Sequence, residues 1–213
     1  MKYFSKQKIE SIKYRLYLMR LRQRLKNENF SIICNNCIAG VLYHNLGKRF
    51  DSPTINLFIT GNDYLAFVKD LKYYCACDID EISDASVNYP IGVLVPMDKN
   101  HIPIKIHFQH YDSFKIAKQK WQERCARIHW DNLHFIWVFY DNVYPLELAK
   151  EFDLLPIHKI ILTHRNIEGI NHQFALPFYE REYKTALVFE KSKDTGRLYL
   201  DDWDYVSFLN GDK

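Results

Sequence analysis

Residues 30–40 read Phe30-Ser-Ile-Ile-Cys-Asn-Asn-Cys-Ile-Ala-Gly40, and this stretch decides the fold. Its first five residues are mostly apolar, which is typical of a short buried strand, and the strand ends at two asparagines. A helix is predicted next, over residues 37–46. It ends at Gly47, because glycine readily adopts the left-handed conformation that closes many helices. The stretch therefore predicts a strand, a turn and a helix in immediate succession.

The same alternation continues along the chain. Further strands are predicted at residues 55–59, 91–95, 102–108, 133–140 and 158–163, and further helices at 60–73, 113–128 and 146–152. A polar turn over residues 97–101 joins two of these strands as a hairpin. Strands that alternate with helices indicate a largely parallel sheet with helices on both faces. We therefore predict a three-layer α/β/α fold with a mostly parallel, mixed central sheet, an edge strand at 186–189 and a terminal helix at 202–209.

A long basic helix is predicted at residues 5–27, ahead of this pattern. Nine Lys or Arg against two Glu give residues 1–28 a net charge of +7, so the rest of a chain of net charge +3 carries −4. Two apolar stripes lie on opposite sides of the helix: Ile9, Ile12, Leu16 and Met19 on one, and Tyr14, Leu18, Leu21 and Leu25 on the other.

One stripe suits the domain body, and the other suits a partner subunit or an anionic membrane surface. The alternatives are a helix enclosed within one fold and a basic face that is only solvated. No nucleic acid is expected as a partner, because no recognised binding motif accompanies the basic charge. The chain thus divides into residues 1–28, the basic helix, and residues 29–213, a single α/β domain.

Composition limits the class of protein. The 213 residues are 47% hydrophobic, which is enough for one sizeable core. The first 25 residues lack the apolar run of a signal peptide, and no stretch approaches the roughly 20 apolar residues of a membrane span. We predict a cytoplasmic protein with reduced thiols, peripheral at the inner face of the membrane if it binds there. The spacing of the Cys75-x-Cys77 pair is atypical of structural zinc, so no metal is expected and the cofactor is unknown.

The best candidate site lies at the end of the first strand. Asn35 and Asn36 occupy the carboxyl end of that strand, where ligands gather in open α/β sheets. Their amides suit sugar hydroxyls or an oxyanion. Cys37 falls in the first helical turn, where the helix dipole favours the thiolate, so it is a candidate nucleophile. The alternative is that the asparagines cap the helix and Cys37 is a packed thiol.

Other polar residues complete the candidate set. His107 and His110 close a strand and are candidate general bases. The candidate substrate-binding residues are Ser52 and Thr54 beside a rigid proline, the first-turn carboxylate Asp63, the cation Arg124, the aromatic Trp130, and Asp131 and Asn132 at the start of a strand.

Each of these residues also has a structural reading as a cap, a turn or a solvated face. The position of Asp131 and Asn132 at an amino end weakens their link to Asn35. The sequence has no glycine-rich phosphate loop and no G-x-S-x-G motif, which disfavours nucleotide hydrolysis and serine-hydrolase chemistry.

Several short motifs occur in one order along residues 29–163: Ser31-Ile-Ile-x-Asn-Asn-Cys37-x-x-Gly40, Ser52-Pro-Thr54, Tyr89-Pro-Ile-Gly92, Ile106-His-Phe-x-His-Tyr111, Lys120-Trp121 and Trp130-Asp-Asn132. This ordered set resembles the bacterial domain-of-unknown-function family nineteen-nineteen, often labelled exopolysaccharide biosynthesis protein. The resemblance implies a three-layer α/β fold and a link to capsule or lipopolysaccharide loci, but no particular reaction. Cys34 stands where relatives often carry a small hydroxyl residue, so Cys37 is the thiol that matches the motif.

Two hypotheses of function follow. The first is a transferase, with acyl transfer as one form, that acts on a bacterial surface polysaccharide or its precursor. Cys37 or His110 would act as nucleophile or base, Asn35 and Asn36 would hold the substrate, and the basic helix would attract a phosphorylated donor or a lipid-linked acceptor. The alternative is a non-catalytic accessory protein that binds glycan or scaffolds a synthesis complex. Both hypotheses expect a sugar or a lipid-linked glycan as the ligand.

Overall fold

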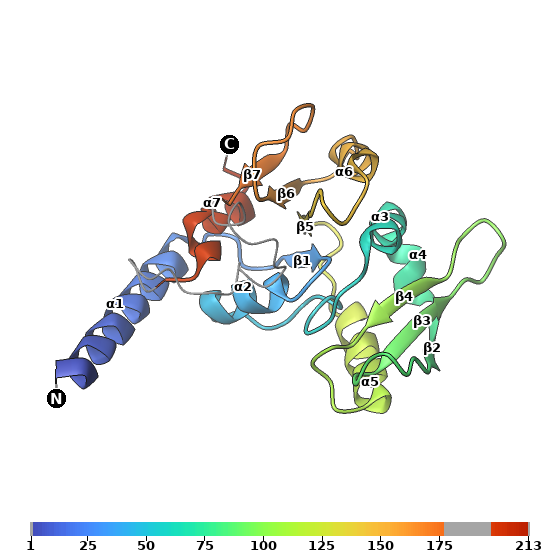
Figure 1. Ribbon diagram of the computed structural model, residues 1–213, viewed down its shortest axis with the longest axis horizontal. Helices are drawn as coiled ribbons and strands as arrows, with labels where there is room; N and C mark the ends of the chain where they lie inside the picture. Colours follow the sequence, from blue (N-terminus) through green and yellow to red (C-terminus); the bar gives the residue numbers. More distant parts are fainter. Residues whose placement is uncertain (1, 177–196, 213) are drawn as a thin grey trace.

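The computed structural model describes residues 2–176 and 197–212, with side chains from residue 8 onward (Figure 1). The helices within these ranges are α1 (Lys2–Arg24), α2 (Ile38–Leu46), α3 (Gly61–Lys69), α4 (Leu71–Ala76), α5 (Phe114–Cys125), α6 (Leu146–Asp153), the 3-10 helix η3 (Tyr199–Asp202) and α7 (Tyr205–Asn210). The strands are β1 (Ser31–Cys34), β2 (Asp78–Ile82), β3 (Ile91–Val95), β4 (Ile104–His107), β5 (Leu133–Val138), β6 (Lys159–Thr163) and β7 (Gln173–Ala175). The strand predicted at 186–189 lies outside the described residues.

A parallel sheet forms the centre of the molecule. Its strand order is β1-β5-β6-β7, and every neighbouring pair is parallel. β1 and β5 are buried on both faces, as their continuous apolar sequences predict. Side chains alternate across the sheet, so Ile33 and Trp137 enter one core while Ile32 and Ile136 enter the other. This arrangement confirms the predicted α/β class and the covered parallel sheet.

The two cores are closed by different helices. Residues of α3, α4, α5 and α6 fill the first core, and residues of α1, α2, η3 and α7 fill the second. In Figure 1, α1 and α7 are drawn to the left of β1, and α5 is drawn at the lower right, below the antiparallel strands. The sheet therefore separates two helical layers. The loops that follow its strands lie at the ends of the strands, between the two layers.

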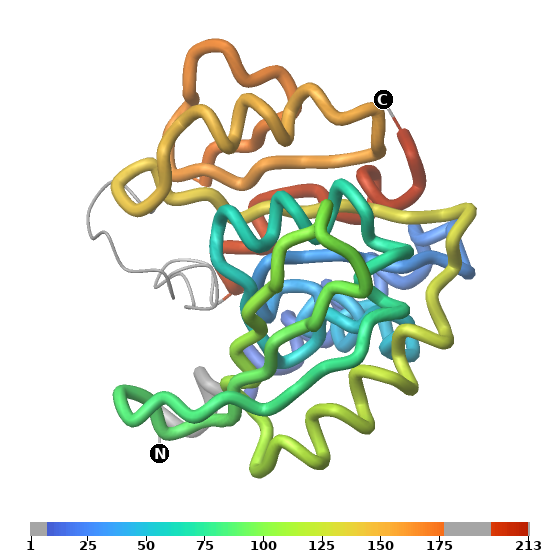
Figure 2. The backbone as a smooth tube through the Cα atoms, turned by 90° about the vertical axis from the view of Figure 1, so that its right-hand side faces the viewer, coloured from blue at the N-terminus to red at the C-terminus, as the bar shows by residue number. Residues whose placement is uncertain are grey.

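The antiparallel strands form a second sheet rather than part of one mixed sheet. Its order is β2-β3-β4, and Figure 2 views the molecule from the end that carries it. Ile79, Leu94 and Ile104 of this sheet belong to the same core as Trp137, so the two sheets share one apolar interior. The predicted single mixed sheet is corrected in this respect.

The predicted strand at residues 55–59 is wrong. Only Phe58 pairs there, in an isolated antiparallel bridge with His107. Asn56 has a φ of 62°, which no strand permits. The hydroxyl of Thr54 instead accepts a hydrogen bond from the backbone N–H of Cys34 at 3.0 Å. A side chain thus covers the free edge of β1, and the segment passes alongside the sheet as a loop.

The predicted helix at residues 60–73 is two helices. The chain breaks at Asp70, where φ is −139° and ψ is 58°, and the Asp70 carboxylate caps α4 by accepting from the N–H of Tyr73. The other helices and strands predicted from residue 30 to residue 163 appear with shifts of a few residues at their ends. The predicted terminal helix corresponds to η3 and α7.

Candidate functional site

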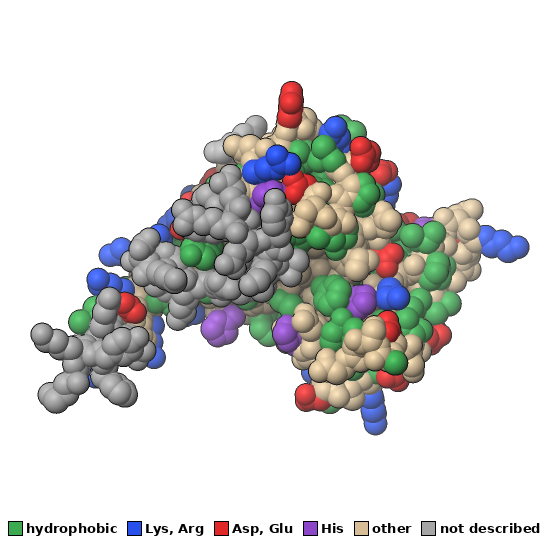
Figure 3. Space-filling model, viewed as in Figure 1, with side chains coloured by type: hydrophobic (Ala, Val, Ile, Leu, Met, Phe, Trp, Pro, Cys, Tyr) green, Lys and Arg blue, Asp and Glu red, His purple; other side chains and the backbone are tan. Residues whose placement is uncertain are grey.

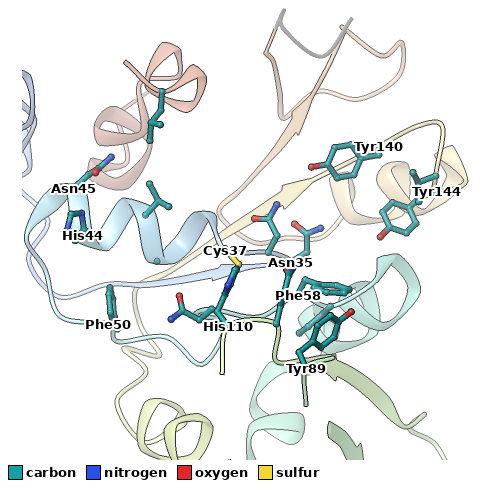
Figure 4. A pocket seen from close by; sticks show the side chains of 18 of the residues that line it. Asn35, Cys37, His44, Asn45, Phe50, Phe58, Tyr89, His110, Tyr140 and Tyr144 are labelled. Atoms are coloured by element: carbon teal, nitrogen blue, oxygen red, sulfur yellow. The ribbon is translucent and has the colours of Figure 1, made fainter. Parts of the chain in front are cut away.

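A cavity of about 1140 Å³ opens at the carboxyl ends of β1 and β5 (Figure 4). Asn35 and Asn36 follow β1 and line the cavity, and Tyr140 follows β5 and lines it as well. The remaining lining residues come from α1, α2, the loop over residues 50–59, the segments around residues 89 and 109–110, the α6 approach and residue 198: Tyr14, Cys37, Gly40, Val41, His44, Asn45, Phe50, Asn56, Phe58, Ile59, Tyr89, Gln109, His110, Val143, Tyr144 and Leu198.

Asn35 ties the two central strands together at the floor of this cavity. Its Oδ1 accepts from the N–H of Val138 at 2.9 Å, and its Nδ2 donates to the Val138 carbonyl at 3.1 Å. The side chain thereby extends the pairing of β1 with β5 by one more residue. Because both polar ends of the amide are used and the residue is 5% exposed, Asn35 positions the turn more than it offers groups to a ligand.

Asn36 has one polar end used and one available. Its Oδ1 accepts from the N–H of Ile38 at 3.0 Å and from the Cys34 thiol at 3.3 Å, so it satisfies a free amide at the start of α2. Its Nδ2 makes no hydrogen bond with any residue that the structure describes. The amide nitrogen is therefore a donor that a ligand in the cavity can use.

Cys37 is a protonated thiol. Its Sγ donates to the Leu57 carbonyl at 3.7 Å, and burial raises the pKa of the thiol to about 11. The expected effect was the opposite, because Cys37 occupies the N-cap position of α2, where the helix dipole favours the thiolate. Burial outweighs the dipole, so Cys37 acts as a hydrogen-bond donor at neutral pH.

Three neighbouring side chains present unused polar groups to the cavity: Asn56, Gln109 and His110. All three are exposed, and none makes a side-chain hydrogen bond within residues 2–176 and 197–212. Their backbones are fixed to one another, since the N–H of His110 donates to the Asn56 carbonyl at 3.3 Å. The left-handed backbone of Asn56 makes this close approach possible.

An aromatic wall faces these amides. Phe58 and Tyr89 line the cavity, and the imidazole of His107 stacks on Phe58 from behind with centroids 4.2 Å apart. His107 does not itself line the cavity. Burial, with a smaller effect from the charge of Lys105, lowers the pKa of His107 and so favours its neutral form. The predicted pair of histidines is thus divided: His110 reaches the cavity and His107 supports its wall.

No charged side chain lines the described part of the cavity. The lining side chains are aromatic, aliphatic, amide, imidazole or thiol, and none is Asp, Glu, Lys or Arg. The space is therefore suited to a neutral ligand with an apolar face and several hydroxyl groups.

Ser52, Thr54, Asp63 and Arg124 lie elsewhere and are used internally. Ser52 and Thr54 are fully buried, and Ser52 pairs with Thr54 at 3.1 Å along the edge of β1. The Asp63 carboxylate accepts from the N–H of Lys105 at 3.0 Å and links α3 to β4. The buried Arg124 donates to the Ile55 carbonyl at 3.4 Å and to the Tyr111 hydroxyl, so it holds the 50–59 loop from beneath.

Trp130, Asp131 and Asn132 lie at the amino ends of β1 and β5. Asn132 donates to the Asn29 carbonyl and to the side chain of Asn27, which fixes the connection between α1 and β1. Trp130 is 40% exposed and lines a separate cavity of about 360 Å³. The structure therefore brings together Asn35, Asn36, Cys37 and His110, and it places the other candidates outside this group.

Sequence reasoning missed most of the aromatic and amide lining. One signal was present: Tyr140 follows the buried strand β5, and the rule that drew attention to Asn35 after β1 applies equally to it. Asn56 and Phe58 gave no such signal, because their segment has the composition of a strand.

The fold and the cavity define an α/β domain with a ligand cavity at the carboxyl edge of its parallel sheet. The chain matches the family described as Domain of unknown function (DUF1919) over residues 8–210, and it belongs to this family. It is also similar to an uncharacterized protein of Haemophilus influenzae (strain ATCC 51907 / DSM 11121 / KW20 / Rd). The two are 30% identical over 209 residues, which cover 96% of this chain and 97% of the relative. The family predicted from the ordered motifs is thus confirmed.

Proposed function

We propose that the cavity binds a neutral sugar unit of a bacterial surface polysaccharide or of its precursor. The observation that carries the proposal is a lining of aromatic faces beside free amide and imidazole groups, without charged side chains in the described part. Aromatic faces pack against the C–H face of a sugar ring, and Asn36, Asn56 and Gln109 offer donors and acceptors for its hydroxyl groups.

The size of the cavity supports more than one sugar unit. Its volume of about 1140 Å³ exceeds the range of roughly 300–1,000 Å³ that is usual for small-molecule sites. A phosphate group of a donor or carrier would find no Lys or Arg among the described lining residues. The bound portion is therefore the sugar, and any phosphate of the same molecule lies outside the cavity.

The more specific proposal is a transferase in which His110 is the general base. The exposed imidazole lies among the free polar groups of the cavity, and histidine is the side chain that most often serves as a general base. His110 would take the proton of an acceptor hydroxyl as its oxygen forms a bond to the acyl carbon of a donor. The donor's leaving group would depart with the bonding electrons. The Cys37 thiol would keep its hydrogen bond to the Leu57 carbonyl and would not attack the acyl carbon.

The binding proposal is tested with neutral glycosides. Titration of the chain with methyl glycosides and with fragments of bacterial surface polysaccharide, followed by saturation-transfer NMR, should show binding. Tyr89→Ala removes one aromatic face and should weaken it about tenfold. Trp130→Ala is the matched control, because Trp130 is an exposed aromatic residue at the amino ends of the strands, away from the cavity. Equal effects of the two variants, or no signal with any glycoside, would remove the proposal.

Catalysis is separated from binding by His110→Ala and Cys37→Ala. In a strain that lacks the chromosomal copy, mass spectrometry of the surface glycan should show modification reduced about 100-fold by His110→Ala, because general bases typically contribute that much or more. Cys37→Ala should retain modification. Unchanged modification in both variants, with glycoside binding intact, would leave the alternative of a non-catalytic glycan-binding accessory protein.

A further inference from the structure

One side of α1 is apolar and uncovered. Ile9, Ile12, Leu16 and Met19 are each 50–53% exposed, and their spacing of three, four and three residues places them on one face of the helix. The opposite face is covered, because Leu21 is 4% exposed and Leu18 and Leu25 pack against the second core. Within the described residues, one of the two apolar stripes meets the domain body and the other is exposed.

Basic side chains border the exposed stripe on both sides. At 100° per residue, Lys8 and Arg15 lie along one border and Lys13 and Arg20 along the other. All four are exposed, and none forms an ion pair within the part of the chain that the structure describes. Figure 3 shows Lys and Arg side chains along the described part of α1.

The last turn of α1 differs from this pattern because it is anchored to the body. Arg22 donates through Nε to the Asn45 carbonyl at 2.8 Å, and Arg24 pairs with Asp204. From residue 8 onward, the basic residues of α1 thus divide into two that fix the helix and four that remain available to a partner. The division follows position along the helix, since the two anchored residues lie in its last turn.

We propose that this face of α1 docks on an anionic membrane surface. The four apolar side chains would enter the boundary between headgroups and acyl chains, and the four basic side chains would meet lipid phosphates. A helix of 23 residues is about 35 Å long and would lie in the plane of the surface. Among the described residues, no helix is long and apolar enough to cross the membrane.

Charge favours this occupant over a second copy of the chain. Self-pairing of the stripe would place the borders of Lys8, Lys13, Arg15 and Arg20 near their own copies. Glu10, the single acidic residue in α1, points away from the stripe. Like charges at an interface oppose association, whereas a surface of lipid phosphates neutralises them.

The same helix also reaches the cavity. Tyr14 lies on the covered side of α1 and lines the cavity wall. Since a helix with its side chains is about 10–12 Å across, docking would hold that wall about one helix diameter from the lipid headgroups. A glycan on a lipid carrier would then lie within reach of the cavity. This last point rests on the proposed function, whereas membrane docking stands without it.

Vesicle sedimentation with the full chain tests the proposal. The chain should bind vesicles of phosphatidylethanolamine with phosphatidylglycerol, and should bind phosphatidylcholine vesicles weakly. Changing Lys8, Lys13, Arg15 and Arg20 to Gln should weaken binding about 100-fold or more at low salt. Changing Ile9, Ile12, Leu16 and Met19 to Ser should weaken binding to both kinds of vesicle at least about tenfold.

Each variant has a control of the same size on other surfaces. Lys72, Lys99, Lys115 and Lys150 are exposed, and their change to Gln removes the same charge. Met97, Ile102, Ile116 and Leu154 are exposed, and their change to Ser removes comparable apolar area. Both controls should bind vesicles as the unaltered chain does, and circular dichroism should show that all four variants are folded.

Three results would overturn the proposal. They are no binding to anionic vesicles, an equal loss in the controls, or a dimer that forms through the stripe and does not bind vesicles. The last would show that a second copy occupies the face. Failure of the proposed function is distinguishable, because a chain that binds vesicles and no glycoside would retract the sugar site and leave the membrane surface in place.

Discussion

At the scale of single residues, Cys37 shows how two opposing effects are weighed. A helix N-terminus stabilises a nearby negative charge by about 0.3–1 kcal/mol at exposed positions. One pKa unit corresponds to about 1.4 kcal/mol, so the dipole lowers a thiol pKa by less than about one unit. Burial raises the pKa of Cys37 from 9.0 to about 11, which is the larger effect. The same position in the chain would carry a reactive thiolate only if it were open to water.

The reactivity of Cys37 provides a direct check. With a pKa of about 11, only about 0.1% of the thiol is ionised at pH 8, because each pH unit below the pKa reduces the thiolate about tenfold. Iodoacetamide should therefore alkylate Cys37 slowly at pH 8 and about tenfold faster at pH 9. Peptide mapping by mass spectrometry gives the rate, and the chain unfolded in urea is the control. A rate that levels off below pH 9 would show a lowered pKa.

Sequence reasoning proposed residues at the floor of the cavity but few of those in its wall. Asn35 and Asn36 were found because they end a buried strand, and His110 because it follows another. Thr54 and Arg124 have equally suitable chemistry, but their polar atoms are used by backbone groups of β1 and of the 50–59 loop. Sequence alone does not reveal which donors and acceptors are already satisfied inside the fold.

At the scale of elements, α2 offers a matched pair of glycines. Gly47 ends the helix with a φ of 66°, and its N–H bonds to the His44 carbonyl at 3.1 Å. Gly40 lies within the helix, where an added Cβ would make ordinary contacts with Ile55 at 3.5 Å and Asn56 at 3.6 Å. The same substitution should therefore have opposite effects at the two positions.

We expect Gly47→Ala to lower the free energy of unfolding by about 1–2 kcal/mol, because alanine is strained in the left-handed region. Gly40→Ala should raise it by up to about 1 kcal/mol, because alanine favours the helix. Urea denaturation of both variants measures the difference. A destabilised Gly40→Ala with an unaffected Gly47→Ala would contradict this account of how α2 begins and ends.

The strands show which patterns are visible in a sequence. β1, β5 and β6 were predicted because strands buried on both faces are continuous apolar runs. β2 was missed, since Asp78–Ile82 has three acidic residues and only two isoleucines, and the pair Asp80-Glu81 breaks the alternation that marks a strand. The 55–59 segment has an apolar composition because it packs against both cores, and its Asn56 turn is not visible in that composition.

At the scale of the whole molecule, the shared core bears on whether residues 29–213 form a single domain. Phe135 and Trp137 of the parallel sheet and Ile79 and Ile104 of the antiparallel sheet belong to one apolar cluster. Separating the sheets would expose that cluster to water, at a cost of roughly 25 cal/mol for each Å² of apolar surface. The sequence predicted the layers, but not that the antiparallel strands would leave the central sheet.

Unfolding should therefore be cooperative across both sheets. Tryptophan fluorescence reports on both cores through Trp137 and Trp203, and far-ultraviolet circular dichroism reports on all elements. The two signals should follow one coincident transition in urea. A plateau between two transitions would indicate that the antiparallel sheet and its helices unfold as a separate unit, and that residues 29–213 are not a single domain.

Tyr14 connects the cavity to the exposed face of α1. It stands in the cavity wall while the other side of its helix carries the exposed stripe, so one rigid element touches both places. If docking of α1 shifts Tyr14, the two binding events are thermodynamically coupled, and the coupling is reciprocal. The factor by which docking raises the affinity for a sugar is then also the factor by which a bound sugar raises the affinity for the membrane. Under the two proposals, a sugar-bound protein would then leave the membrane more slowly than an empty one.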